Sequence, residues 1–494
     1  MQQFKSKIQS VIKDTSLRFF ETSFNQVGPS SLMMIRIGKD DFLMIDQDSA
    51  LYQDLMGEEI ANQLKKCPTN HANRLVLNEY FDFTNPQAFG KNVATIGLGD
   101  RLGLASPGHI QTVHDRQIKP VLAQQSIREL ELTNRNIEDV IDAASYAVFR
   151  EGYRGGFGAD GDHLKKESDI KKAIDAGFSM LTLDCSDQID NSVTQLTSEE
   201  RLAKFNQLDS ATKAHYQEKY LGRSFNVEGL SIEFDQDILS YNVLLYHEAI
   251  AYMVHIYQTY IEPIDRPIDF EISIDETETI TTPESHFFVA NELIDQNVDV
   301  TSLAPRFIGE FQKGIDYIGE IDRFKVDFRE HALIAKNFGY KVSVHSGSDK
   351  FSIFPIVADL TEGLFHLKTA GTNWLEAIRL IGMKNPELFR DMFTYALDHF
   401  EEARAYYHIT PALDQIKPLD QVNDHDLPDY LNDDNARQVW HITYGILLTA
   451  KTDTGSPLFS DEFFKTLLNY EEDYHQLLIN HIGKHLDLLA IYKD

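Results

Sequence analysis

Two histidines, His163 and His345, each follow a short apolar segment and could bind a metal ion together. Neutral imidazole is a ligand for Zn, Mn, Fe, Co and Ni, and a carboxylate commonly completes such a site. Glu310, Asp275 and Asp184 also follow apolar segments, and spacing does not decide which is the third ligand; we take Glu310 as the expected one. A single histidine near a strand is more often a packing residue, but polar residues recur at many segment ends, which favours a metal site.

Two carboxylates have the placement of an acid/base pair. Asp162 directly precedes His163 and is a candidate general base. Glu271 lies inside an apolar segment, between Phe270 and Ile272. Poor solvation there would raise the pKa of Glu271 and suit a general acid, whereas a structural ion pair is the alternative for this residue.

Eight short apolar segments must position these residues, and most are followed by a helical pattern. They are residues 93–97, 120–123, 156–159, 180–183, 270–274, 302–304, 340–344 and 364–367. Strands that alternate with helices predict a parallel sheet, and eight such units predict a closed (β/α)8 TIM barrel of the α/β class. An open, doubly wound sheet is the alternative. In a barrel, His163 and His345 would follow the third and seventh strands, which face each other.

The remaining chain adds three parts to the predicted barrel of residues 91–383. Residues 1–90 form a small α/β appendage, with a hairpin of strands at 32–37 and 42–45 and a possible third strand at 75–77. Residues 186–266 are predicted as a helical insertion after the fourth strand. Residues 384–494 are predicted as a helical C-terminal extension.

Composition limits the partners and the compartment. The chain has 494 residues, 42% hydrophobic residues and a formal net charge of −31. This charge argues against nucleic acid and anionic membranes as partners, because both require clustered Lys and Arg. The two cysteines, Cys67 and Cys185, form no disulfide framework, and no apolar run approaches the length of a membrane span. We therefore expect a cytoplasmic protein, with a homo-oligomer left open.

Three weaker motifs receive simpler interpretations. The glycines of residues 97–103 follow a strand, but their spacing is a poor match to a dinucleotide loop. His481 and His485 share one helical face, which is more typical of packing than of a metal site. The polar run 432–435 indicates a solvated loop, because further calcium ligands at loop spacing are missing.

Seven stretches of the chain resemble the tagaturonate/fructuronate epimerase family. They are residues 97–103 (GLGDRLG), 156–163 (GFGADGDH), 275–279 (DETET), 306–310 (RFIGE), 345–352 (HSGSDKFS), 368–372 (KTAGT) and 396–402 (ALDHFEE). The similarity covers the barrel and the C-terminal helices and is weaker over the first 90 residues. Gly161 departs from the alanine expected in the family. The resemblance implies a divalent-metal-dependent isomerase that interconverts D-tagaturonate and D-fructuronate.

The chemistry of these sugar acids favours retro-aldol cleavage and re-addition. The carbon that inverts is β to the ketone, so its C–H is not acidic. A base instead removes the hydroxyl proton, the adjacent C–C bond breaks, and the aldehyde turns before the bond re-forms. A metal would stabilise the enediolate as a Lewis acid. Transient oxidation by a bound nicotinamide is the alternative mechanism.

This chemistry and the placement of the polar residues lead us to assign a role to each. His163 and His345 would hold the metal, and Asp162 and Glu271 would be the acid/base pair. The substrate carboxylate would be bound by a cation, for which the candidates are Arg306, Lys350 and Lys368. Rival functions are a metal-dependent aldolase or ketose isomerase acting on a related sugar acid, and a non-enzymatic protein that binds sugar acids.

Overall fold

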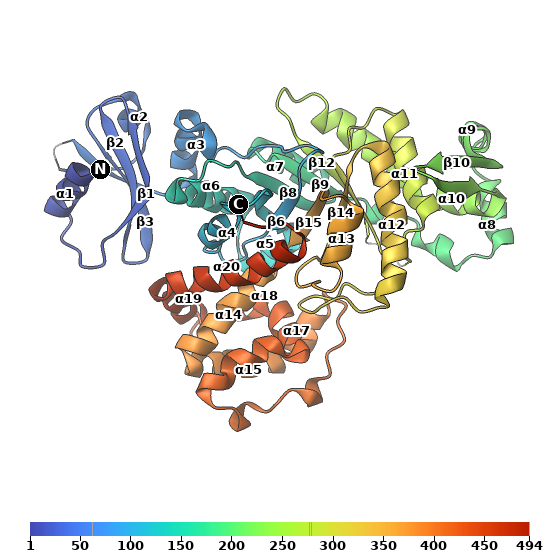
Figure 1. Cartoon of the computed structure of the whole chain (residues 1–494). Helices are drawn as coiled ribbons and strands as arrows, with labels where there is room; N and C mark the ends of the chain where they lie inside the picture. Colours follow the sequence, from blue (N-terminus) through green and yellow to red (C-terminus); the bar gives the residue numbers. More distant parts are fainter. Residues whose placement is uncertain (62, 276, 278, 494) are drawn as a thin grey trace.

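A closed barrel of eight parallel strands forms the centre of the molecule (Figure 1). The structure, a computed structural model, describes residues 1–61, 63–275, 277 and 279–493. The barrel strands are β6 (Thr95–Leu98), β7 (Lys119–Ser126), β8 (Gly158–Leu164), β9 (Met180–Asp184), β12 (Asp269–Ile274), β13 (Ser302–Pro305), β14 (Lys341–Val344) and β15 (Phe365–Thr369). Each overlaps one of the predicted apolar segments. The predicted (β/α)8 barrel is confirmed, and the open sheet is wrong.

Helices surround the barrel and connect its strands. They are α4 (Ser106–Val113), α5 (Ile127–Thr133), α6 (Ile137–Glu151), α7 (Glu167–Asp175), α11 (Pro283–Asp295), α12 (Ile321–Phe338), α13 (Phe354–Leu360) and α14 (Thr372–Lys384). Local sequence sets their ends. A capping box between Asn136 and Asp139 begins α6, and Gly152 ends it with a φ of 62°. Gly339 ends α12 in the same left-handed conformation.

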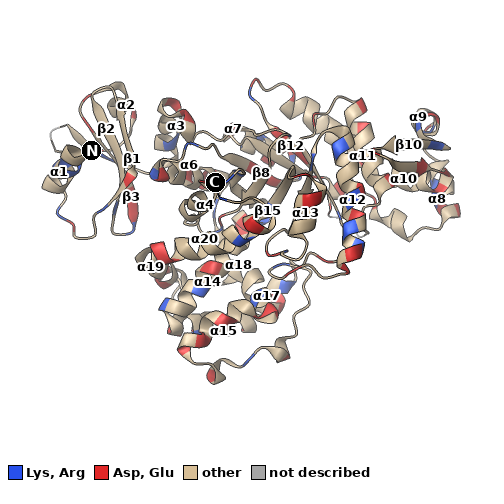
Figure 2. Ribbon diagram, viewed as in Figure 1, with Lys and Arg blue, Asp and Glu red and all other residues tan. Residues whose placement is uncertain are grey.

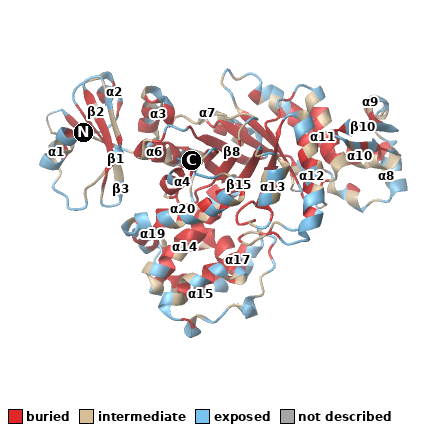
Figure 3. Ribbon diagram, in the orientation of Figure 1, coloured by how far each residue is buried: buried red, intermediate tan, exposed pale blue. Residues whose placement is uncertain are grey.

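The barrel interior beneath its carboxyl end is polar. Thr182, Glu271 and Ser302 are in register on β9, β12 and β13, so their side chains point to the same side of the sheet. All three are buried, as are the barrel strands in Figure 3. Branched apolar side chains usually fill this space. A polar interior requires partners for its buried groups, and these partners are the residues that support the site described below.

The N-terminal part is a separate antiparallel sheet with the strand order β1-β2-β3-β5-β4. Its elements are α1 (Gln2–Val11), β1 (Arg18–Val27), β2 (Ser30–Ile37), β3 (Asp40–Asp46), α2 (Ala50–Asp54), β4 (Glu58–Ala61), β5 (Leu64–Pro68) and α3 (His71–Tyr80). The predicted hairpin is β2 paired with β3. The predicted strand at 75–77 is wrong, because these residues lie in α3. Asn70 caps that helix by accepting the backbone N–H of Asn73.

The insertion between β9 and β12 is helical, as predicted, and also contains a hairpin that was not predicted. It consists of α8 (Ser198–Phe205), α9 (Ser210–Tyr220), β10 (Arg223–Val227), β11 (Leu230–Phe234) and α10 (Gln236–Ile256). Figure 1 places it, in green, at the end of the molecule away from the N-terminal sheet. The hairpin turns at Glu228 and Gly229, both of which have a positive φ.

The C-terminal part is helical, as predicted. Its helices are α15 (Pro386–Asp398), α16 (Phe400–Arg404), α17 (Asp434–Ile442), α18 (Tyr444–Thr449), α19 (Ser460–Asn469) and α20 (Glu471–Leu488). They enclose an apolar core of their own, with Trp374, Phe389 and Trp440 fully buried. Helix α20 packs against α4 and α14. This packing brings segments of the C-terminal part to the barrel.

Charged residues are spread over the outer elements. Figure 2 shows Asp and Glu on helices throughout the molecule, with Lys and Arg interspersed. Among the helices of the described residues, none combines the length and apolar character needed to cross a bilayer.

Candidate active site

All eight barrel strands contribute side chains to one cavity of about 820 Å³ at their carboxyl ends. The contributing side chains include Arg101, Gln124, Asp162, His163, Asp184, Asp275, Arg306, His345 and Lys368. Tyr406, Tyr407, His408 and His441 of the C-terminal part complete the wall. This end of a TIM barrel is where enzymes on the fold place their active sites.

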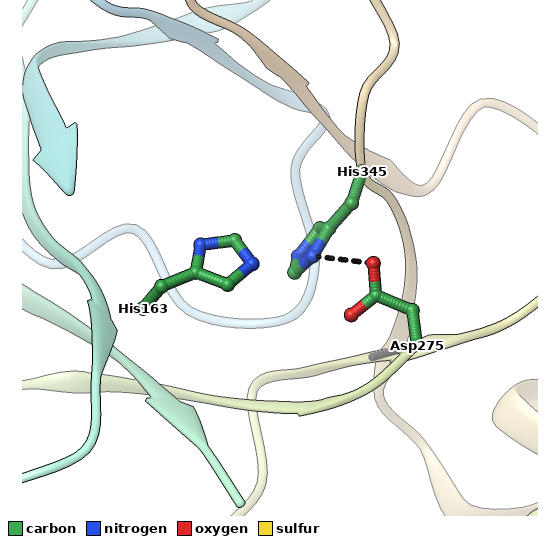
Figure 4. Close-up of side chains that lie close together, drawn as sticks. All are labelled: His163, Asp275 and His345. Atoms are coloured by element: carbon green, nitrogen blue, oxygen red, sulfur yellow. Dashed lines mark ion pairs between the residues drawn. The ribbon is translucent and has the colours of Figure 1, made fainter. Parts of the chain in front are cut away.

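His163, Asp275 and His345 converge inside this cavity (Figure 4). One potential ligand atom from each residue lies within 4.8 Å of the others. The two imidazole rings have their centroids 4.8 Å apart, and Asp275 Oδ2 lies 3.2 Å from His345 Nδ1. The histidines come from opposite sides of the barrel, as the sequence suggested. Two nitrogens and a carboxylate therefore face a common point.

A second carboxylate orients each histidine. His163 Nδ1 lies 2.7 Å from Asp162 Oδ1, and His345 Nε2 lies 2.8 Å from Glu271 Oε1. A carboxylate that accepts the N–H of one ring nitrogen leaves the lone pair on the other nitrogen, which is a common arrangement at metal-binding histidines. His345 Nδ1 is buried and faces Asp275 Oδ2, the neighbouring potential ligand atom, at 3.2 Å. The nitrogen available to a ligand is therefore Nε2 of His163 and Nδ1 of His345.

The backbone at both histidines departs from regular strand geometry. His163 has a φ of 54°, and Ser346, directly after His345, has a φ of 51°. The register of β8 against β9 shifts between Gly161 and Leu164, so His163 lies in a bulge. Left-handed non-glycine residues and bulges are unfavourable locally but redirect side chains at functional sites. Here they direct His163 into the cavity.

Lys368 forms ion pairs with Asp162 and Glu271, the two carboxylates that orient the histidines. Its Nζ lies 2.7 Å from Asp160 Oδ2, 2.7 Å from Asp162 Oδ1 and 3.0 Å from Glu271 Oε1. Burial opposes the charge of Lys368, but the three carboxylates outweigh burial and hold its pKa well above the usual range. Burial raises the pKa of Asp160, to about 6. The negative charges of Asp162 and Glu271 add to this rise, and Lys368 opposes it. The cluster as a whole carries more negative than positive charge.

The site fits a divalent cation. Burial alone would lower the pKa of His345, but Asp275 and Glu271 raise it to about 10, so the site stabilises positive charge on this ring. Two imidazole nitrogens and one carboxylate suit a transition-metal ion and leave coordination positions for substrate oxygens. His163, His345 and Asp275 are the residues that would hold such an ion.

Glu310, which we expected as the third ligand, lies elsewhere. It lines the same cavity, but its side chain is 49% exposed and contacts Gln312 and His408. Asp275 occupies the place beside the histidines. The sequence could not distinguish them, because the loops after β12 and β13 bring both residues to the same cavity. In the motif at 275–279, Glu276 and Glu278 lie outside the described residues.

Glu271 differs from its expected role as a general acid. It is fully buried, and its carboxylate accepts hydrogen bonds from Thr182 and Ser302 in addition to contacting His345 and Lys368. Burial would raise the pKa of Glu271, but Lys368 and the neighbouring histidines hold it well below the usual range. The expected raised pKa is wrong. Glu271 orients His345 and does not line the cavity.

Three cations were expected to bind a substrate carboxylate. Of these, Arg306 lies where it could contact a substrate in the cavity. Its Nη1 donates to the carbonyl of Thr277, and the exposed guanidinium lines the cavity. Lys350 is buried and donates to the carbonyls of Gln312, Ile315 and Ser348 at 2.6–3.1 Å. Lys368 is engaged by the three carboxylates described above. Lys350 and Lys368 therefore have structural partners in place of a substrate.

The second histidine group, in the C-terminal part, is a packed ion cluster. Asp349, His481 and His485 lie close together. His485 Nε2 accepts the backbone N–H of Asp349, and His485 Nδ1 bonds to the carbonyl of His481. His481 lies between Asp349 and Glu376, and Arg437 also binds Asp349, at 2.6 Å. Both nitrogens of His485 are occupied, so the cluster connects α20 to the barrel, as the packing interpretation expected.

The glycine-rich stretch 97–103 has a packing role. The side chain of Gln124 lies so close to Gly97 that a Cβ there would come 1.5 Å from Gln124 Oε1. Asp100 accepts the backbone N–H groups of Leu102, Gly103 and Ala105 at 2.8–3.0 Å and so closes the loop around itself. The loop shape follows from these contacts.

Several residues of the cavity were not identified from the sequence. Lys313, whose Nζ donates to Ser346 Oγ at 2.8 Å, lines it, as do Tyr407 and His408 of the C-terminal part. These residues lie in irregular segments, where hydrophobic periodicity gives no signal. Lys313 lies between β13 and α12, and the packing of the C-terminal helices brings Tyr407 and His408 to the barrel.

A TIM barrel with a histidine and carboxylate site at the carboxyl ends of its strands defines this chain as a barrel enzyme. The sequence model of the family described as tagaturonate epimerase matches residues 20–489. The tagaturonate/fructuronate epimerase of Thermotoga maritima is 45% identical over 424 residues, which is 86% of each chain. The chain belongs to the tagaturonate epimerase family and is an isomerase.

Solved structures agree with this assignment. The native crystal structure of fructuronate-tagaturonate epimerase UxaE from Cohnella laeviribosi is 55% identical and superposes with a TM-score of 0.96 over 100% of both chains. A crystal structure of the same protein in complex with two glycerol molecules gives a TM-score of 0.95 over 99% of both chains. The N-terminal sheet, the insertion and the C-terminal helices are therefore shared with that protein.

Proposed function

We propose that this protein interconverts D-tagaturonate and D-fructuronate by metal-dependent retro-aldol cleavage and re-addition. Membership of the tagaturonate epimerase family supports the substrate pair. The convergence of His163, Asp275 and His345 is the observation that carries the metal requirement. A divalent cation held there would supply a Lewis acid that stabilises the negative charge of the enediolate.

The chain's own residues bind the substrate and move its protons. Arg306 has guanidinium N–H groups beyond the one bonded to Thr277, and these would bind the substrate carboxylate. Asp162 lines the cavity, and its carboxylate would take the proton of the hydroxyl at the carbon that inverts. Lys368, 2.7 Å from Asp162, would compensate the charge of that carboxylate in the buried surroundings.

The bond changes balance without an added oxidant. The O–H electron pair becomes the C=O bond of an aldehyde, and the pair of the broken C–C bond moves toward the ketone oxygen to give an enediolate. Rotation of the aldehyde presents its other face, and the reverse steps produce the epimer. The C–H bond at the inverting carbon is never broken.

Incubation of tagaturonate in D2O tests this proposal. Fructuronate should form without deuterium at the inverting carbon, and an acid quench should release dihydroxyacetone from the three-carbon enediolate. Deuterium at that carbon would contradict the retro-aldol route. Accumulation of cleavage products in place of fructuronate would indicate an aldolase, and binding without turnover would indicate a sugar-acid binding protein.

A further inference from the structure

We propose that Glu310 is the second acid/base residue of the epimerisation and acts from the cavity wall across from Asp162. This inference rests on the proposed retro-aldol function. Inversion places the reacting hydroxyl on opposite sides of the carbon before and after the reaction. One group must take the proton on the first side, and another must return a proton on the second side. Since Glu271 does not reach the cavity, the partner of Asp162 must be another residue.

Elimination among the carboxylates of the cavity points to Glu310. Among the residues that the structure describes, the carboxylates that line it are Glu129, Asp162, Asp169, Asp184, Asp275 and Glu310. Asp275 belongs to the histidine group, and Asp162 is already assigned as the first acid/base residue. The other three besides Glu310 lie within 4.0 Å of a Lys or Arg nitrogen, namely Arg101 for Glu129, Lys172 for Asp169 and Lys165 for Asp184. Among the described residues, Glu310 has no Lys or Arg at that distance. Glu310 is thus the described carboxylate of this wall that is neither beside the histidines nor paired with a Lys or Arg.

Glu310 is held in place by its surroundings, although half of its side chain is exposed. Its backbone pairs with Ile318 in both directions, at 2.9 and 3.2 Å. Gln312 donates an amide N–H to Glu310 Oε2. Gln312 is itself buried, and its Oε1 accepts from the Thr410 backbone N–H at 3.0 Å and from Gln438 at 2.9 Å. A buried amide that orients a half-exposed carboxylate gives the preorganisation expected of a reacting group.

The position of Glu310 matches the geometry that inversion requires. Asp162 lies on β8, and Glu310 follows β13; these strands are separated by three steps around the barrel in one direction and by five in the other. The two residues thus enter the wall from well-separated strands of the barrel. His408, which is 80% exposed, has its Nε2 3.7 Å from Glu310 Oε2. It connects Glu310 to solvent for proton exchange.

The proton balance is simple. With one epimer, Asp162 takes the hydroxyl proton as the C–C bond breaks, and after rotation and re-addition the new alkoxide takes a proton from Glu310. With the other epimer, Glu310 is the base and Asp162 is the acid. Each turnover moves one proton from one carboxylate to the other, and exchange with water restores the starting state.

Single-turnover cleavage of each epimer tests the assignment with metal-loaded enzyme. The variants Glu310→Gln and Asp162→Asn are mixed with tagaturonate or fructuronate, and dihydroxyacetone is measured after an acid quench. Glu310→Gln should lose about 100-fold or more in the cleavage rate of one epimer and stay within about 3-fold for the other, and Asp162→Asn should show the opposite preference. Metal content should be unchanged in Glu310→Gln. Glu320→Gln, an exposed glutamate after the same loop, serves as the control.

Equal losses with both epimers, or no loss with either, would overturn the assignment of Glu310. Loss of metal from Glu310→Gln would also overturn it, because Glu310 would then act as a ligand. Failure of the wild-type enzyme to interconvert the epimers would instead remove the proposed function itself.

Discussion

Glu271 Oε1 lies 2.8 Å from His345 Nε2, on the side of the ring away from the nitrogen that faces Asp275. Asp162 stands in the same relation to His163, at 2.7 Å. The two carboxylates that looked like an acid/base pair in the sequence thus each orient a histidine, and of these two only Asp162 also lines the cavity, where it is the proposed base. Each fixes the tautomer of one histidine, and Lys368 compensates the charge of both.

Glu271→Gln should weaken metal binding. The amide oxygen can still accept from His345, but the charge that strengthens this hydrogen bond is lost, and outer-shell changes of this kind reduce affinity by about 10- to 100-fold. Competition with a chromophoric chelator measures the effect, and Glu131→Gln on the exposed face of α5 is the control. Wild-type affinity in Glu271→Gln would refute the orienting role.

Arg306→Ala should raise KM for both epimers by about 10- to 100-fold, because a charge-assisted hydrogen bond to the substrate carboxylate contributes about 1.5–3 kcal/mol. Arg306→Lys should recover part of the loss, since the charge remains while the forked geometry is lost. Steady-state kinetics with both substrates provide the measurement. A KM for Arg306→Ala within about twofold of wild type, on the same scale, would place the carboxylate elsewhere.

Lys350→Met should reduce stability without a matching effect on substrate binding. Lys350 donates to three backbone carbonyls, and its removal leaves buried acceptors unpaired, at a cost of about 2–4 kcal/mol. Urea unfolding measures the stability, and KM is determined on the folded variant. A large rise in KM at unchanged stability would restore Lys350 as a substrate ligand.

His481 should make the stability of the protein depend on pH in the alkaline range. Burial would lower its pKa, but Asp349 and Glu376 raise it to about 9, above its value of about 6.5 in an unfolded chain. The folded state therefore binds the proton more tightly, and this stabilisation is complete below pH 6.5 and is lost as the pH rises through about 9. The shift corresponds to about 3 kcal/mol.

Urea unfolding between pH 6 and pH 10 measures this contribution. The wild type should lose more stability over this range than His481→Gln, in which the titrating group is absent. Parallel pH profiles for the two proteins would show that His481 does not carry the proton in the folded state.

The sequence predicted the elements of this fold well, because the barrel strands are short apolar segments between helical patterns. Leu75–Leu77 was misassigned because a three-residue apolar run fits a strand and one face of a helix equally well. Its helix is identified by the Asn70 cap, which lies outside the apolar run. Hydrophobic patterns along the sequence thus predict helices and strands reliably where the element is long or where the same pattern recurs along the chain.

The roles of the individual residues in the active site were harder to predict from the sequence than the fold was. His163 and His345 could be paired because the barrel topology places their strands across from each other. The role of Glu271 could not be predicted, because the direction of its pKa shift depends on Lys368, which is distant in the chain and adjacent in space. Asp275 and Glu310 were indistinguishable for the same reason, since only the tertiary structure shows which carboxylate faces the histidines.

Metal reconstitution tests the central claim most directly. The wild type and Asp275→Asn are stripped with a chelator, assayed for conversion of tagaturonate into fructuronate, and assayed again after a divalent metal is added back. The wild type should lose activity on stripping and regain it with metal, while Asp275→Asn should remain folded, bind metal poorly and stay nearly inactive. Undiminished epimerisation by metal-free wild-type protein would contradict the account.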